Sequence, residues 1–134
     1  MDIYLLDTNI CIYIAKNNPP KVRERFARYQ ATQLAMSVIT LGELRAGAEK
    51  SQHKKQAIAK LAILENLIPV YEMPIEAAEH YGHIRSSLEK KGQPIGNNDL
   101  WIAAHALSKN WILVTNNERE FKRIKGLPVE NWIN

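Results

Sequence analysis

The stretch YLLDTN, Tyr4 to Asn9, sets an aspartate directly behind a short apolar run. The apolar run, residues 3–6, predicts a buried β-strand, and the residues that follow it, 9–15, predict a helix. Asp7 therefore stands where a strand gives way to a helix. A carboxylate at such a junction caps the helix, or it belongs to a binding site, because ligands bind at the carboxyl ends of strands in parallel α/β sheets.

The alternation of strand and helix continues along the chain. Apolar runs predict further strands at residues 34–39, 69–71, 111–114 and 129–133. Helical patterns lie between them, at residues 20–30, 40–50, 55–66, 75–91 and 98–109. This alternation indicates an α/β layer fold with a mainly parallel sheet. The length of 134 residues suits one domain, expected to span residues 1–134.

The composition and the N-terminal residues indicate the cellular compartment of the protein. No apolar run approaches the roughly 18 residues that a bilayer span needs, so we expect no membrane partner. The N-terminus has no basic stretch followed by a long apolar one, as a secretory signal would have. Cys11 is the only cysteine, which rules out an internal disulfide and suits a reducing compartment. We therefore expect a cytoplasmic protein.

Positive charge is concentrated in one part of the chain. The net charge is +4, yet residues 16–60 hold ten Lys or Arg against three Glu, a balance of +7. A basic surface attracts phosphate backbones, and Arg23, Arg25 and Arg28 are candidates for guiding RNA. A solvated helix surface is an equally good interpretation of the charge alone.

Three acids stand near strand-to-helix junctions. Asp7 follows the first strand, Glu43 lies in SVITLGELRAG, and Asp99 opens the helix of PIGNNDLWIAAHAL. Each also has a local interpretation. Asp7 can cap its helix, Thr40 and Glu43 match the spacing of a capping box, and Asp99 can complement the positive end of a helix dipole.

The neighbours of Asp99 favour a shared site. On a helix, Asp99 lies on one face with Ile102, Ala103 and Ala106, and this apolar face is expected to pack inward. Carboxylates gathered there repel, because two charges about 5 Å apart cost about 3 kcal/mol at an effective dielectric near 20. A cation relieves the repulsion, and all-oxygen ligands select hard ions such as Mg²⁺ or Mn²⁺. Such an ion activates water for attack on a phosphate.

The motifs LDTN, SVITLGELRAG, PIGNNDLWIAAHAL and LVTNNEREFKRIKGLPVENW, in this order, resemble the PIN-domain ribonucleases of the VapC toxin family. The resemblance covers nearly the whole chain. It implies a three-layer α/β/α domain with a short, mainly parallel central sheet. It also implies RNA cleavage that depends on Mg²⁺, with Mn²⁺ as a substitute ion, within a type II toxin–antitoxin system. The implied partners are a VapB-type antitoxin and a second copy of the chain in a homodimer.

By resemblance, the metal-site acids of the family fall on Asp7, Glu43 and Asp99. In the mechanism that we predict, Asp7 and Asp99 bind Mg²⁺ directly. Glu43 binds it through water or helps to deprotonate the attacking water. The RNA target of the family is often a single structured RNA, which among close relatives is the initiator transfer RNA.

A fourth acidic position of the wider PIN superfamily would fall in TNNERE, residues 115–120. Asn116 and Asn117 stand where an aspartate is common, and Glu120 is preferred over Glu118 as the nearest acid, so a second metal ion is left open. Thr115 offers a hydroxyl that orients a metal-bound water, or it is a satisfied threonine at the end of a strand.

Other interpretations remain open at this point. The apolar helices at residues 10–15 and 22–29 form a groove for the antitoxin tail, or they are plain core helices. A HAD-like phosphatase would use Asp7 as nucleophile, but it needs a second acid two positions on, where Asn9 stands. A non-catalytic basic module that binds nucleic acid, with acids that only cap helices, is the other alternative.

Overall fold

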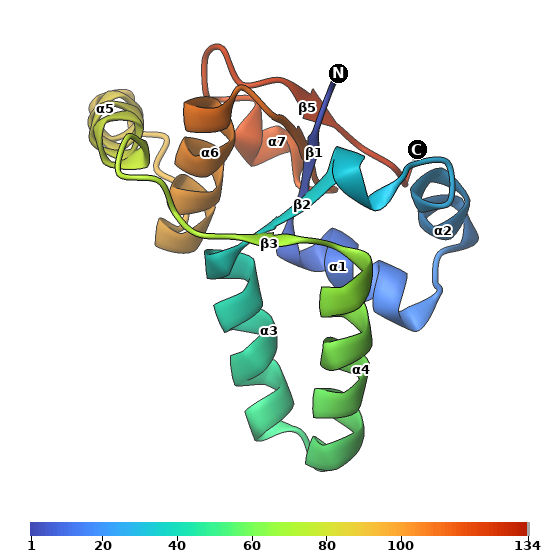
Figure 1. The fold of residues 1–134 in the computed structure, drawn as a ribbon. Coiled ribbons are helices and arrows are strands. Elements are labelled where there is room, and N and C mark those ends of the chain that lie inside the picture. Colours follow the sequence, from blue (N-terminus) through green and yellow to red (C-terminus); the bar gives the residue numbers. More distant parts are fainter. Residues whose placement is uncertain (134) are drawn as a thin grey trace.

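The computed structural model describes residues 1–133. In chain order its elements are β1 (Tyr4–Leu6), α1 (Thr8–Lys16), α2 (Pro20–Phe26), the 3₁₀ helix η1 (Ala31–Gln33), β2 (Leu34–Ser37), α3 (Val38–Lys50), α4 (Lys54–Leu67), β3 (Val70–Tyr71), α5 (Ala77–Lys90), α6 (Asn97–Lys109), β4 (Ile112–Val114), α7 (Glu118–Phe121) and β5 (Val129–Glu130) (Figure 1). Within this range, no helix is both long enough and apolar enough to cross a bilayer.

The sheet has five strands in the order β3-β2-β1-β4-β5, and each neighbouring pair is parallel. The chain starts in the middle with β1 and adds β2 and β3 on one side. It then returns to place β4 and β5 on the other side. The direction of winding therefore reverses between β1 and β4, and in open α/β sheets ligands bind in the crevice at such a reversal.

The pleat of the strands divides the core into two layers. Leu5 and Leu113 face the helices α5, α6 and α7, whereas Leu6 and Val114 face α1, α2 and α4. The four side chains are fully buried. Helices therefore cover both faces of the sheet, which confirms the expected three-layer α/β/α fold.

Helices α3 and α4 pack against each other as a hairpin that extends beyond the sheet (Figure 1). Helix α1 contacts both of them. Because α1 begins directly after β1, this packing brings the start of α1 beside α3, the helix that carries Glu43.

The junction between β2 and α3 differs from the expected one. The strand ends at Ser37, whose Oγ accepts a hydrogen bond of 3.2 Å from the backbone N–H of Ile39 and caps α3. Thr40 is thus inside the helix and fully buried. The capping-box interpretation of Thr40 and Glu43 is therefore wrong, because the helix starts one turn earlier.

Other helix and strand boundaries differ from the predicted ones by a few residues. Helix α2 ends at Phe26 rather than at residue 30, and β5 ends at Glu130 rather than at residue 133. The short helices η1 and α7 were not expected. Segments of three or four residues are too short to show a helical period in the sequence.

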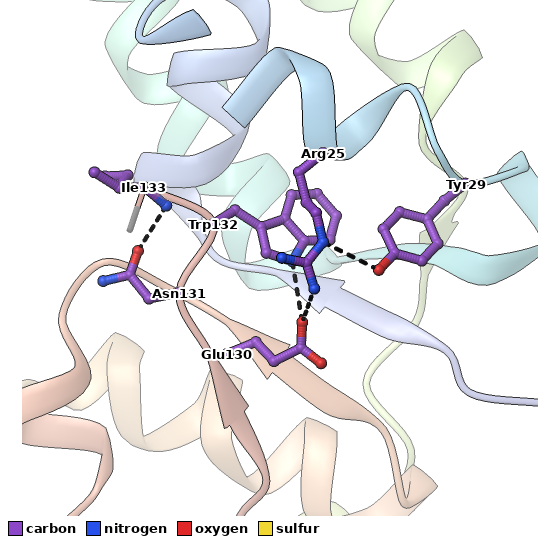
Figure 2. A network of polar contacts seen from close by, with 6 residues as sticks. All are labelled: Arg25, Tyr29, Glu130, Asn131, Trp132 and Ile133. Atoms are coloured by element: carbon purple, nitrogen blue, oxygen red, sulfur yellow. Dashed lines mark hydrogen bonds and ion pairs between the residues drawn. The ribbon is translucent and has the colours of Figure 1, made fainter. Parts of the chain in front are cut away.

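The end of the chain is fastened against α2 and the turn that follows it (Figure 2). Arg25 Nη2 lies 2.9 Å from Glu130 Oε1, and Arg25 Nε donates to the hydroxyl of Tyr29 at 3.3 Å. The ring of Trp132 stacks on Tyr29 with centroids 5.3 Å apart and is only 1% exposed. Arg25, Tyr29, Glu130 and Trp132 together are called the clamp, and its Trp132 is buried in the same apolar cluster as residues of α1 and α2.

Candidate active site

Asp7 and Thr115 flank the crevice at the point where the winding reverses. Asp7 follows β1, and Thr115 follows β4. The Thr115 hydroxyl donates to Asp7 Oδ2 at 2.5 Å, and the backbone N–H of Asn9 donates to Asp7 Oδ1 at 2.7 Å. Asp7 therefore caps α1 with one oxygen and reaches across the crevice with the other. The helix-cap interpretation of Asp7 is confirmed, and its part in a binding site stays a prediction.

Burial makes the charge of Asp7 costly. The residue is 5% exposed, and this burial is the largest cause that raises the pKa of Asp7 above its usual value. The hydrogen bonds from Thr115 and Asn9 act in the opposite direction, and the charge of Glu43 raises the pKa further. The net direction is upward, so a nearby cation would stabilise the ionised form.

Glu43 is hydrogen-bonded to Thr8 at the start of α1, and Thr8 in turn lies next to Thr40. The hydroxyl of Thr8 donates to Glu43 Oε1 at 2.5 Å, and the hydroxyl oxygens of Thr8 and Thr40 are 3.3 Å apart. Thr8 was not among the predicted site residues, and Thr40 was predicted only as a helix cap. Their signals were present, since Thr8 follows Asp7 directly and Thr40 precedes Glu43 by three residues on one helix face.

Asp99 completes the group of acids from the first turn of α6. The pKa of Asp99 is raised to about 6, first by burial and then by the charges of Asp7, Glu43 and Glu120. A helix dipole would act in the opposite direction on an acid at this end. The three sequence-predicted acids, from three distant segments, therefore repel one another across one site.

The predicted inward face of α6 is confirmed. Ile102 is 1% exposed, and Ala103 and Ala106 are fully buried. Asp99 lies on this same face in the first turn of α6, and its carboxylate is therefore partly buried.

The segment after β4 adds polar groups to the site. The hydroxyl oxygen of Thr115 accepts a bond of 2.9 Å from the backbone N–H of Asn117. Asn117 Nδ2 donates in turn to Glu120 Oε2 at 3.2 Å, and the charge of Glu120 acts on Asp99. Thr115, Asn117 and Glu120 therefore belong to the same group as Asp7 and Asp99.

Two neighbours in this segment point elsewhere. Asn116 Nδ2 donates to the hydroxyl of Tyr13 at 2.9 Å. Glu118 accepts from Asn131 Nδ2 at 3.1 Å and pairs with Lys122 at 3.2 Å. Glu118 is thus engaged outside the acidic group, whereas Glu120 lies within reach of it.

The three predicted guiding arginines are separate from the acids. Arg25 is engaged in the C-terminal clamp with Glu130 and Trp132. Arg23 is exposed on α2, and Arg28 is exposed just beyond its end. Their role in guiding RNA stays a prediction.

The residues present suit a hard cation. Carboxylates and hydroxyls are oxygen donors. The charge of Glu43 raises the pKa of Asp7, the charges of Asp7 and Glu43 raise the pKa of Asp99, and a divalent ion would relieve this repulsion. Among residues 1–133, no three His, Cys, Asp or Glu side chains are grouped closely enough to ligate one ion together. Mg²⁺ is commonly bound by one or two carboxylates and keeps several waters, so the arrangement fits this ion.

A groove leads away from the acids. It has a volume of about 460 Å³ and begins at Thr8 and Glu43. Its lining comes from α1, α3 and α4 and includes Ile12, Leu44, Leu61 and, at the rim, the cations Lys16 and Lys60. Residues 10–15 contribute to this lining, whereas residues 22–29 do not, and Val22 of α2 is fully buried in the core. That the antitoxin tail lies in a groove on these helices stays a prediction.

Known proteins match this chain over nearly its full length. Residues 4–127 match the PIN domain. Ribonuclease VapC1 of Haemophilus influenzae (strain R2866) is 45% identical over 131 residues, 97% of this chain and 98% of that protein. The tRNA(fMet)-specific endonuclease VapC of Shigella flexneri is 46% identical over 129 residues, 96% of this chain and 97% of that protein. The DNA-bound VapBC of Salmonella typhimurium matches with a TM-score of 0.91 and 42% identity, over 98% of this chain and 99% of its counterpart. The chain belongs to the VapC ribonucleases of the PIN-domain family.

Proposed function

We propose that this protein is the toxin of a cytoplasmic type II toxin–antitoxin system and acts as a Mg²⁺-dependent endoribonuclease, with residues 1–134 forming one domain. The observation that carries the proposal is the convergence of acids from distant segments on one crevice. Asp7, Glu43 and Glu120 raise the pKa of Asp99 across the crevice where the sheet reverses its winding. Membership of the VapC ribonucleases supports the same activity.

In this proposal Asp7 and Asp99 hold the ion directly, and Glu43 interacts with it through water. A bound Mg²⁺ supplies positive charge that polarises the scissile phosphate and acidifies water. Mn²⁺ has similar ligand preferences and is expected to replace it.

The side chains of the protein contribute orientation and proton transfer. Thr115 holds Asp7, and Thr8 holds Glu43 through Oε1. The second oxygen of Glu43, Oε2, is then available to accept a proton from the attacking water. Attack at phosphorus breaks the bond to the 3′ oxygen, which takes up a proton. The products carry a 5′ phosphate and a 3′ hydroxyl.

The substrate that we propose is a structured RNA, with initiator tRNA as the first candidate. The Shigella flexneri relative is named a tRNA(fMet)-specific endonuclease, and it is 46% identical to this chain. The basic segment of residues 16–60 supplies the charge that attracts a folded RNA backbone. The phosphatase alternative has no support, because Asn9 occupies the position of its proton donor.

The partner that we propose for the groove is a segment of a VapB-type antitoxin. Solved relatives from Salmonella typhimurium and Rickettsia felis are VapBC complexes. The groove offers an apolar floor for a helix or an extended segment, and Thr8 and Glu43 are among its lining residues. A segment that fills it would cover Glu43 and keep RNA from the site.

The decisive test compares two carboxylate-to-amide variants. Asp99→Asn should lower cleavage of initiator tRNA by at least about 100-fold, since even outer-shell partners of a metal contribute about 10- to 100-fold. The matched control, Glu118→Gln, changes an acid that lies outside the acidic group and should cleave normally. Assays with Mg²⁺, with Mn²⁺ and with EDTA, followed by sequencing of the new ends, measure both effects. Cleavage that survives EDTA or the Asp99→Asn change would contradict the proposal.

A further inference from the structure

His105 is a buried histidine with one partner. It lies on α6, is fully buried, and its Nδ1 is 2.9 Å from Ser37 Oγ at the end of β2. Its other ring nitrogen, Nε2, is buried and has no hydrogen-bond partner among residues 1–133. Burial, with a smaller contribution from Lys109, lowers the pKa of His105 to about 4. The ring is therefore neutral at physiological pH.

The count of hydrogen bonds identifies the donor in this pair. Ser37 Oγ already accepts from the backbone N–H of Ile39. If Nδ1 donated to Ser37, both the Ser37 proton and the lone pair of Nε2 would lack partners within the described residues. If Ser37 donates to Nδ1, only the proton on Nε2 is left without one. The second arrangement satisfies more groups, so the Ser37 hydroxyl donates to His105.

The pair connects the two helices that carry Glu43 and Asp99. Ser37 caps α3, and Glu43 lies six residues further along it. Asp99 lies six residues before His105 on α6. Each acid is thus about 9 Å along its own helix from the pair, at a rise of about 1.5 Å per residue. A change in the angle between α3 and α6 at this point would move the two carboxylates relative to each other.

We propose that His105 is a positioning residue of the candidate active site, which accepts the Ser37 hydroxyl proton and so fixes the start of α3 against α6. The role of the two acids rests on the proposed function, whereas the contact between the helices does not. A leucine at this place would remove the unpaired Nε2, but it would leave the buried hydroxyl proton of Ser37 without its acceptor. The histidine supplies the acceptor that an apolar side chain lacks.

The test compares His105→Asn with His105→Leu. The two side chains have nearly the same shape, but only asparagine has an oxygen at the position of Nδ1. In metal-free protein, the NMR signals of Thr8 and Glu43 should match the wild type in His105→Asn and shift in His105→Leu. Mn²⁺ affinity, measured by calorimetry, should fall about 10- to 100-fold in His105→Leu, the range typical of outer-shell partners. Its kcat should fall while the KM for RNA stays constant.

Each outcome separates the two proposals. Unchanged Thr8 and Glu43 signals in His105→Leu, or equal shifts in both variants, would overturn the role of His105 whether or not metal binds. A wild-type protein that binds no Mn²⁺ would defeat the proposed function, while the NMR comparison would still decide the role of His105. A melting temperature that is unchanged or higher in His105→Leu would support positioning over stability. If His105→Leu fails to fold, the comparison is made with His105→Met, which also lacks an acceptor at Nδ1.

Discussion

Asp7 shows how one side chain can combine two physical tasks. Its Oδ1 caps α1 and its Oδ2 accepts the Thr115 hydroxyl, so both oxygens are satisfied in a nearly dry place. Hydrogen bonds to charged groups contribute about 1.5–3 kcal/mol each. These bonds partly offset the cost of burying the charge. The part of this cost that they do not offset raises the pKa of Asp7.

If Asp99 binds the metal ion as proposed, its raised pKa makes metal binding dependent on pH. Its pKa of about 6 means that the carboxyl is largely protonated at pH 5 and ionised at pH 8 in the metal-free protein. Because a metal ligand must be deprotonated, Mn²⁺ affinity should rise with pH through about 6 and then level off. Calorimetric titrations between pH 5 and 8 measure this rise. An affinity that stays constant across this interval would show that Asp99 is not a ligand.

Asp99 also makes the free energy of unfolding depend on pH, and this stability falls with rising pH whereas the expected Mn²⁺ affinity rises. The folded pKa of Asp99 lies above its usual 3.8, so its neutral form is favoured in the folded state. Its contribution is present below pH 3.8 and is lost as the pH rises through about 6. In EDTA, Asp99→Asn should therefore melt at a higher temperature than the wild type at pH 8, with a smaller difference at pH 4. A variant less stable than the wild type at pH 8 would contradict this.

At the scale of elements, the end of the chain depends on an aromatic side chain more than on an ion pair. Trp132 is 1% exposed and stacks on Tyr29 (Figure 2), whereas the side chains of Arg25 and Glu130 are each 32% exposed. Trp132→Ala should lower the free energy of unfolding by about 3–5 kcal/mol. Glu130→Gln should lower it by about 1 kcal/mol or less, as for partly exposed pairs. Urea unfolding measures both, and equal effects would show that the ion pair contributes as much to the clamp as the aromatic side chain, against the prediction.

Element types could be predicted from the sequence, but some boundaries could not. The apolar run at residues 34–39 predicted one strand, but β2 ends at Ser37 and α3 begins at Val38. A buried strand and the buried start of a helix have the same apolar pattern in so short a run. Ser37 ends the strand because its side chain caps α3, a local contact that the run of apolar residues conceals. Thr40 then becomes a buried residue of the helix rather than its cap.

At the scale of the whole molecule, the site depends on topology. Asp7 and Thr115 are 108 residues apart in sequence, and they meet because β1 and β4 are neighbours in the sheet. The sequence placed both at strand ends, but the strand order could not be derived from it. For the same reason the bonds from Thr8 to Glu43 and from His105 to Ser37 could not be anticipated, since each joins elements whose proximity depends on packing.

The groove gives a test of regulation that leaves the acids untouched. Ala15 is exposed on α1 and lines the groove, whereas Ala62 is exposed on α4 and lies outside its lining. Ala15→Glu should place a charge in the apolar groove and release the enzyme from a cognate VapB-type antitoxin, with RNA cleavage unchanged. Ala62→Glu should remain inhibited. Cleavage assays with added antitoxin measure the difference, and full inhibition of Ala15→Glu would assign the antitoxin to another surface.

The double use of Asp7 has a practical consequence for making a harmless form of the protein. Replacing Asp7 by alanine would remove the cap of α1 as well as a carboxylate, at a cost of about 1 kcal/mol from the cap alone. An inactive variant that keeps its stability is better made by replacing Asp99, because Asp99 is not the cap of its helix. A mutation of residue 7 that removes the proposed metal ligand would also remove the cap of α1. Loss of activity and loss of stability would then be inherited together.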